Sequence, residues 1–116
     1  MEKLKIEAGE AFKNGDIATA LTIYDECLTM DPLYNEFNMT IYFNKACALA
    51  KVNRNEEALL TLNQAIEINK QYVKAYFKRG DILLALNRFD EAIAEYNRVK
   101  EINPQTPGLR EKLKHA

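Results

Sequence analysis

A short frame recurs three times along this chain, and each copy contains an alanine near the start of the second helix of a predicted helix pair. The copies occupy residues 15–21, 53–59 and 87–93, with Ala20, Ala58 and Ala92 as the alanines. Each copy reads as a tight turn followed by an acidic or polar helix start. Twelve residues after the first and third alanines stand Pro32 and Pro104, whereas the middle copy has Lys70 there. A proline lacks the amide donor that a helix needs, so each proline predicts the end of a second helix.

The spacing of the three alanines indicates the type of repeat. Ala58 and Ala92 are 34 residues apart, whereas Ala20 and Ala58 are 38 apart, so four extra residues lie within 33–38. A period of about 34 residues with two helices per unit is typical of tetratricopeptide (TPR) repeats. The chain therefore resembles the TPR family over nearly its whole length. This resemblance implies an all-α fold in which three helix-turn-helix units stack as a right-handed superhelix.

Helical periodicity and the positions of proline predict the element boundaries. We expect helices at roughly 2–14, 17–30, 38–52, 55–68, 72–86 and 89–102. A capping helix is expected from about Pro107, and because only about two turns remain, we expect it to be truncated. The units of a single TPR domain, 1–116, are expected at about 1–34, 39–72 and 73–106.

Length, charge and composition argue against several classes of protein. A chain of 116 residues is long enough to form one domain around an apolar core without a disulfide or a metal. Its net charge of -1 is not that of a nucleic-acid-binding protein, and no apolar run reaches the roughly 18 residues of a membrane span. The first five residues do not resemble a signal peptide. We therefore expect a cytoplasmic protein in which Cys27 and Cys47 are reduced thiols.

The resemblance also implies a binding surface, because the first helices of stacked units form the inner wall of a concave groove. Five lysines and two acids fall on this predicted wall, namely Lys5, Lys13, Lys51, Lys74, Lys78, Glu2 and Asp81. Phe12 and Leu84 add apolar side chains beside them. A slightly acidic chain thus concentrates positive charge on one wall. This pattern favours an extended peptide that carries carboxylates and one or two aliphatic side chains.

The wall resembles the carboxylate clamp of TPR co-chaperones, which hold the C-terminal tails of Hsp70 and Hsp90 that end in Glu-Glu-Val-Asp. The five clamp positions of that class fall here on Lys5, Gly9, Asn44, Lys74 and Lys78. Lys5, Asn44 and Lys74 match the class, and Lys51 stands where it commonly has a supporting lysine. The resemblance implies a non-catalytic module for these tails, with the three matching residues on the final carboxylates.

Two clamp positions depart from the pattern of the class, which lowers the expected affinity. Gly9 replaces an asparagine, so one hydrogen bond to a charged acceptor is missing, a loss of about 1.5–3 kcal/mol. Lys78 replaces an arginine and keeps the positive charge, but it lacks the planar two-pronged donor of a guanidinium group.

Within this class the chain is most similar to the last TPR cluster of the co-chaperones that carry two TPR clusters ahead of a J domain. The similar stretches are residues 10–15, 72–76 and 109–114, together with the insertion before Asn44. No His-Pro-Asp motif of a J domain occurs, so stimulation of the Hsp70 ATPase is not expected. Other TPR or J domains of the parent chain are further partners that the resemblance implies. A TPR-bearing immunophilin or phosphatase is the alternative parent.

Three other functions have less support in the sequence. An enzyme needs a reactive group, yet the single histidine, His115, lies at the chain end, and Cys47 has only Lys51 as a nearby basic partner. We therefore expect no catalysis, no cofactor and no metal. A scaffold TPR would instead pack an amphipathic helix or a neighbouring domain against Phe12, Phe43, Phe77 and Leu84. Self-association through the open face of the last repeat is the third alternative.

Overall fold

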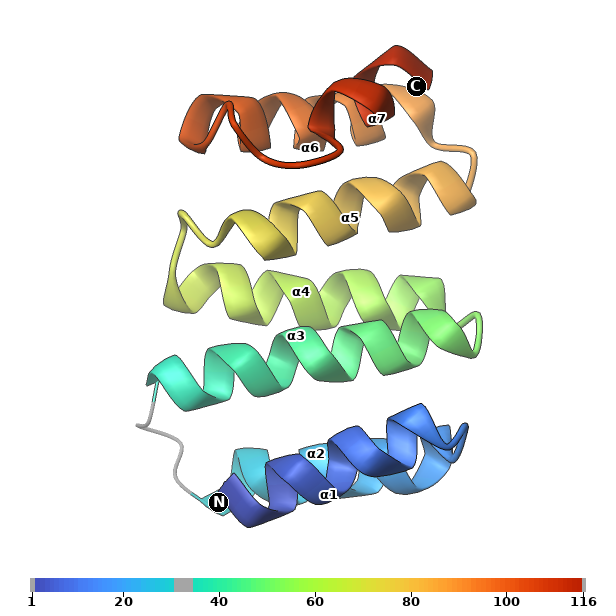
Figure 1. Cartoon of the computed structure of the whole chain (residues 1–116), viewed down its shortest axis with the longest axis vertical. Helices are drawn as coiled ribbons and strands as arrows, with labels where there is room; N and C mark the ends of the chain where they lie inside the picture. Colours follow the sequence, from blue (N-terminus) through green and yellow to red (C-terminus); the bar gives the residue numbers. More distant parts are fainter. Residues whose placement is uncertain (1, 31–34, 116) are drawn as a thin grey trace. The chain divides into compact units, whose positions relative to one another are not determined.

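A computed structural model describes residues 2–30 and 35–115, which are helical and contain no strand (Figure 1). The helices are α1 (Glu2–Lys13), α2 (Ile17–Met30), α3 (Asn35–Lys51), α4 (Asn55–Ile68), α5 (Val73–Ala85), α6 (Phe89–Ile102) and α7 (Leu109–His115). The chain divides into two compact units, an N-terminal unit, Met1–Asn69, and a C-terminal unit, Lys70–Ala116. The predicted all-α fold is confirmed.

The predicted helix boundaries agree with the structure to within one residue, except at the start of α3 and at the capping helix. Helix α3 begins at Asn35, three residues earlier than predicted, and has 17 residues where α5 has 13. Both helices end at the same position of the repeat frame, at Lys51 and Ala85. The four inserted residues therefore appear as an extra first turn of α3. Pro32, predicted to end α2, lies outside the described residues.

The turn between the two helices of each pair has the same backbone conformation in all three copies. Gly15, Asn53 and Asn87 stand at one position of the frame, with φ angles of 83°, 63° and 61°. Glycine and asparagine tolerate this left-handed region best. The next residue donates its amide hydrogen to the carbonyl five residues back over 2.8–2.9 Å, as in Asp16 to Ala11, Arg54 to Leu49 and Arg88 to Leu83. The three copies of the repeat therefore share one turn conformation and one backbone hydrogen bond.

The N-terminal unit packs α1 on α2, α2 on α3 and α3 on α4, with consecutive helices antiparallel (Figure 1). Ala20 and Ala58 are completely buried, as expected for small residues that let two helices approach closely. The inserted turn joins this core, because Phe37 is only 5% exposed and packs in one cluster with Ala8, Tyr24 and Ile41. An ion pair of 2.8 Å between Lys45 Nζ and Asp25 Oδ1 also ties α3 to α2.

The C-terminal unit packs α5 on α6 and α6 on α7, and the ring of Tyr96 lies at its centre. Tyr96 meets Phe77 edge-on, with ring centroids 5.6 Å apart. Its hydroxyl donates a hydrogen bond of 2.6 Å to Asp81 Oδ1. A Cβ at Gly80 would lie 2.5 Å from Tyr96 Cε1, so α5 and α6 approach this closely only because Gly80 has no side chain. Arg79 of α5 also pairs with Glu95 of α6 over 2.7 Å.

Gly9 and Gly80 both lie inside helices, and replacing each with alanine should change the free energy of unfolding in opposite directions. A Cβ at Gly9 would meet nothing within 4 Å, so Gly9→Ala should raise the free energy of unfolding by about 0.5–1 kcal/mol through the lower backbone entropy of alanine. Gly80→Ala should lower it by about 1–3 kcal/mol, because the added methyl group overpacks the Tyr96 contact. Urea unfolding followed by circular dichroism measures both effects. A stability change of the same sign in both variants would contradict this packing.

The Tyr96 hydroxyl predicts a loss of stability in alkaline solution. Burial, together with its hydrogen bond to Asp81, raises the pKa of Tyr96 above the ordinary value of 10.0. The folded protein therefore keeps Tyr96 neutral where the unfolded chain loses the proton. The contribution of this group to stability is complete below about pH 10 and falls by up to about 1.4 kcal/mol for each further pH unit.

Tyr96→Phe should remove that part of the pH dependence, measured by urea unfolding between about pH 8.5 and 11. A smaller dependence should remain, because burial also raises the pKa of Tyr24. An unchanged slope in the variant would show that Tyr96 ionises as easily in the folded protein as in the unfolded chain.

Candidate functional site

Lys5 and Asn44, which the sequence predicts as clamp residues of the N-terminal unit, both lie beside one face of α3. The ammonium nitrogen of Lys5, on α1, lies 6.0 Å from the ring centroid of Phe37 in the inserted turn. Asn44 follows Phe37 by seven residues, so it lies two helical turns further along the same face. Lys5 and Asn44 are both half-buried. Lys5 thus lies beside the first turn of the α3 face on which Asn44 stands two turns later.

The other predicted wall residues of the N-terminal unit differ in what surrounds them. Gly9 follows Lys5 by one turn and has open space where a side chain would project. Lys13 and Lys51 are exposed in the last turns of α1 and α3. Phe12 packs against the core of the unit, and Phe43 is half-buried. The Phe12 ring therefore contributes mainly to stability.

Lys74 and Lys78, which the sequence predicts as clamp residues of the C-terminal unit, lie one turn apart on α5 and so share a face. Lys74 is exposed and Lys78 is half-buried. Phe77, between them in sequence, turns its ring toward Tyr96, and Leu84 is half-buried near the end of the helix. The helix that carries both lysines is thus held against α6 by the Phe77–Tyr96 pair.

Asp81, an acid of the predicted wall, is engaged by partners within the C-terminal unit. Besides the Tyr96 hydroxyl, Lys112 Nζ of α7 lies 3.2 Å from Asp81 Oδ1. The Lys112 ammonium group thus balances the negative charge of Asp81, which is the acid nearest Lys78 in sequence. The sequence predicts only a capping role for α7 and does not point to Lys112, because no spacing within the chain relates this lysine to Asp81.

The five wall lysines have no acidic partner among the residues that the structure describes. The ion pairs seen there join Lys45 to Asp25, Arg54 to Glu57, Arg79 to Glu95, Arg88 to Glu91, Arg98 to Glu101 and Lys112 to Asp81. The other acid predicted on the wall, Glu2, and the histidine His115 have side chains outside the described part. The described lysines of the wall therefore keep their charge available for a ligand.

The predicted clamp combines residues from both units. Lys5 and Asn44 belong to the N-terminal unit, and Lys74 and Lys78 to the C-terminal unit. In the N-terminal unit the predicted residues come from two helices, α1 and α3, whereas in the C-terminal unit both lie on one face of α5. It stays a prediction that these residues line one groove. The superhelix and the single domain over 1–116 also stay predictions.

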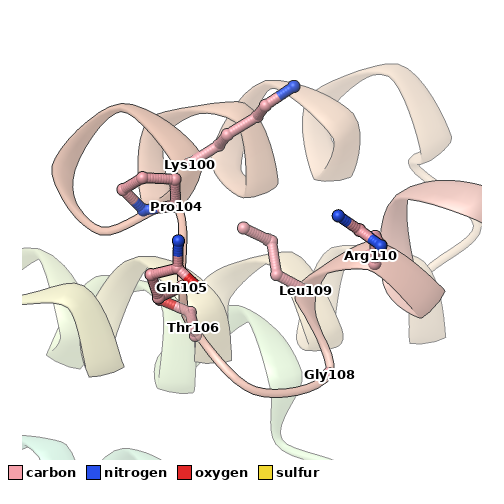
Figure 2. A pocket seen from close by; sticks show the side chains of 7 residues that line it. All are labelled: Lys100, Pro104, Gln105, Thr106, Gly108, Leu109 and Arg110. Carbon is pink, nitrogen blue, oxygen red and sulfur yellow. The ribbon is translucent and has the colours of Figure 1, made fainter.

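Two pockets lie in the C-terminal unit, away from the predicted wall residues. Figure 2 shows the larger one, of about 580 Å³, between the end of α6 and the start of α7. In that view Lys100 lies above the buried Leu109, and Arg110 lies to its right. The smaller one, of about 440 Å³, is lined by Lys70, Gln71, Arg98, Glu101 and Ile102. No predicted site residue lines either pocket.

A metal site, a membrane span and a disulfide each place requirements on the described part of the chain. Over residues 2–30 and 35–115, no three His, Cys, Asp or Glu side chains gather as metal ligands would. No helix of that part is long and apolar enough to cross a membrane. Cys27 is buried, Cys47 is half-buried, and no disulfide joins them.

Comparison with known proteins identifies the repeat. A family model described as Tetratricopeptide repeat matches residues 43–107, more than half of the chain. A relative from Schizosaccharomyces pombe, "DnaJ homolog subfamily C member 7 homolog", is 32% identical over 74 residues, which are 64% of this chain and 16% of the relative. The chain thus matches about one sixth of the length of that curated relative.

Two solved structures are similar over most of the chain. The "First TPR of Spaghetti (RPAP3) bound to HSP90 peptide SRMEEVD" has a TM-score of 0.86 and 29% identity, covering 97% of this chain and 86% of the other. The second TPR domain of human RPAP3, in complex with the HSP70 peptide SGPTIEEVD, has a TM-score of 0.84 and 26% identity, covering 97% and 90%. Together with the family match and the three equivalent turns, these likenesses lead to one conclusion: the chain belongs to the tetratricopeptide repeat family.

Proposed function

We propose that this chain is a non-catalytic module of a cytoplasmic co-chaperone, and that it binds the acidic C-terminal tail of Hsp70 or Hsp90. The observation that carries the proposal is the state of the wall lysines, which have no acidic partner in the described part of the chain. An ammonium group without a partner retains its full attraction for a ligand carboxylate. Lys5, Asn44 and Lys74 would hold the final carboxylates, and Lys78 and Lys51 the preceding acids.

The similar proteins support this choice of ligand. Both RPAP3 domains were solved with peptides that end in Glu-Glu-Val-Asp, one from HSP90 and one from HSP70. The relative from Schizosaccharomyces pombe is a DnaJ-type protein, and "Hsp70-Hsp90 organizing protein 3" of Arabidopsis thaliana is 36% identical over 58 residues. These names support a co-chaperone as the parent of this chain.

The scaffold alternative has less support from the geometry. It needs aromatic side chains that are open to a partner helix. Phe12 packs against the core of the N-terminal unit, and the ring of Phe77 meets Tyr96. These two rings are already used within the fold, whereas the wall lysines are not.

The clamp should recognise the free C-terminal carboxylate of the tail. In calorimetry, a peptide ending in Glu-Glu-Val-Asp should bind about tenfold or more tightly than its C-terminal amide, because the amide lacks one carboxylate charge. Affinity should also fall as salt rises from about 50 to 300 mM, because exposed charges are screened. Equal binding of acid and amide would contradict a carboxylate clamp.

Lys74 offers a matched pair of variants for the same experiment. Lys74→Ala should weaken binding of the free-acid peptide, and it should remove most of the difference between acid and amide. Lys100→Ala is the control, because Lys100 is also an exposed lysine of the C-terminal unit that pairs with no acid of the described residues, but it lies on α6. Similar losses in both variants would indicate attraction by overall charge, without a specific site.

Restoring the missing amide should strengthen binding. Gly9→Asn places a side-chain amide one turn after Lys5, where the structure leaves open space. The added hydrogen bond to a charged acceptor should tighten tail binding by about tenfold or more in calorimetry. Gly9→Ala is the control for the change in helix stability. An affinity for Gly9→Asn no higher than that for Gly9→Ala would exclude Gly9 from the site.

A further inference from the structure

We infer that the inserted first turn of α3 positions Lys5 for carboxylate binding, with the Phe37 ring as the support for its ammonium group. Phe37 is thus a positioning residue that the clamp pattern does not include. The inference rests on the proposed function, because it assigns the orientation of a residue that would bind the chain end of the tail.

The first support is the position of Phe37 in the repeat. The insertion lengthens α3 at its start, and Phe37 lies in this added turn. At the matching position of the next repeat the chain has Gln71, which lies in the turn before α5 begins at Val73. The position of Phe37 therefore lies on a helical turn only in the lengthened helix, and in the next repeat it precedes the helix. The four additional residues thus change what lies beside Lys5, besides changing the length of a connection.

The second support is the rigidity of the ring. Phe37 is 5% exposed and packs in the core cluster that includes Ala8, Tyr24 and Ile41. Side chains in a close-packed core are held in well-defined rotamers. The Lys5 ammonium nitrogen, 6.0 Å from the ring centroid, thus has a fixed support from a residue of another helix.

The third support is the kind of interaction. A cation over an aromatic ring is attracted to the ring, yet it keeps its full charge. An acid in the place of Phe37 would also hold Lys5, but it would compete with a carboxylate of the ligand. Lys5 has no acidic partner in the described part of the chain. The ring therefore restricts the motion of the ammonium group and leaves its charge for the peptide.

The fourth support is the continuity of α3. Phe37 and Asn44 lie on one face of this helix, separated by a rise of roughly 10 Å. The same helix therefore carries the support for Lys5 and the amide of the clamp. Because a helix is stiff over two turns, the distance between these two groups is set by the backbone of α3.

A double-mutant cycle on tail binding separates positioning from structural support. Phe37→Leu keeps an apolar side chain without a ring, and it should weaken binding about two- to fivefold, as expected for loss of a cation–π contact. Phe37→Tyr keeps a ring and should bind like the wild type. In a Lys5→Ala background, Phe37→Leu should have no further effect. Equal losses in the two backgrounds would mean that Phe37 only stabilises the fold, and would overturn the inference.

A second measurement needs no peptide. In NMR spectra of the free protein, the ring current of Phe37 should move the Lys5 side-chain methylene resonances upfield, and Phe37→Leu should abolish this shift. If the wild-type shift is absent, the contact does not form and the inference fails, even where Phe37→Leu does not fold. If the shift is present but no tail binds, the proposed function fails, and the positioning role falls with it.

Discussion

Close contact between the two helices of a pair is the constraint on which the rest of this structure depends. The second helix of each pair begins around a completely buried alanine, Ala20, Ala58 or Ala92. A small side chain there lets the helix backbones approach, and larger apolar groups then pack around the contact. The Gly80–Tyr96 contact is the extreme case, since it has no room for one methyl group. This packing, with the left-handed turn before it, decides which face of each first helix is left for polar side chains.

The distribution of ion pairs separates two roles for cations. Arg54 and Arg88 stand at the same frame position and pair with Glu57 and Glu91, three residues later. These hydrogen bonds hold the pKa values of both glutamates below the ordinary value. Exposed pairs of this kind contribute little to stability, so the wall lysines lose little by having no acidic partner in the described part of the chain. Their open charge is what makes a binding function the best explanation of the surface.

Most of the fold could be predicted from the sequence because its signals are local. Glycine or asparagine in the turn and apolar side chains at helical spacing locate most helix ends to within one residue. The start of α3 was predicted too late, because the residues of the insertion suit either a loop or a helix. Burial of Phe37 against a core that includes residues of other helices stabilises the helical conformation of the insertion. Lys5, Asn44, Lys74 and Lys78 were likewise placed on helix faces by periodicity, whereas Phe37 and Lys112 were not found.

The sequence by itself determined the helix pairs, the turns between them and the helix face on which each predicted clamp residue lies. These features depend on rotation and rise within a single helix, which are the same in every helix. Only the tertiary structure decided which side chain each polar group meets, as for Lys5 over Phe37, Asp81 between Tyr96 and Lys112, and Phe77 against Tyr96. Such contacts join residues of different helices, and their geometry follows from packing across the core, which local spacing along the chain does not specify.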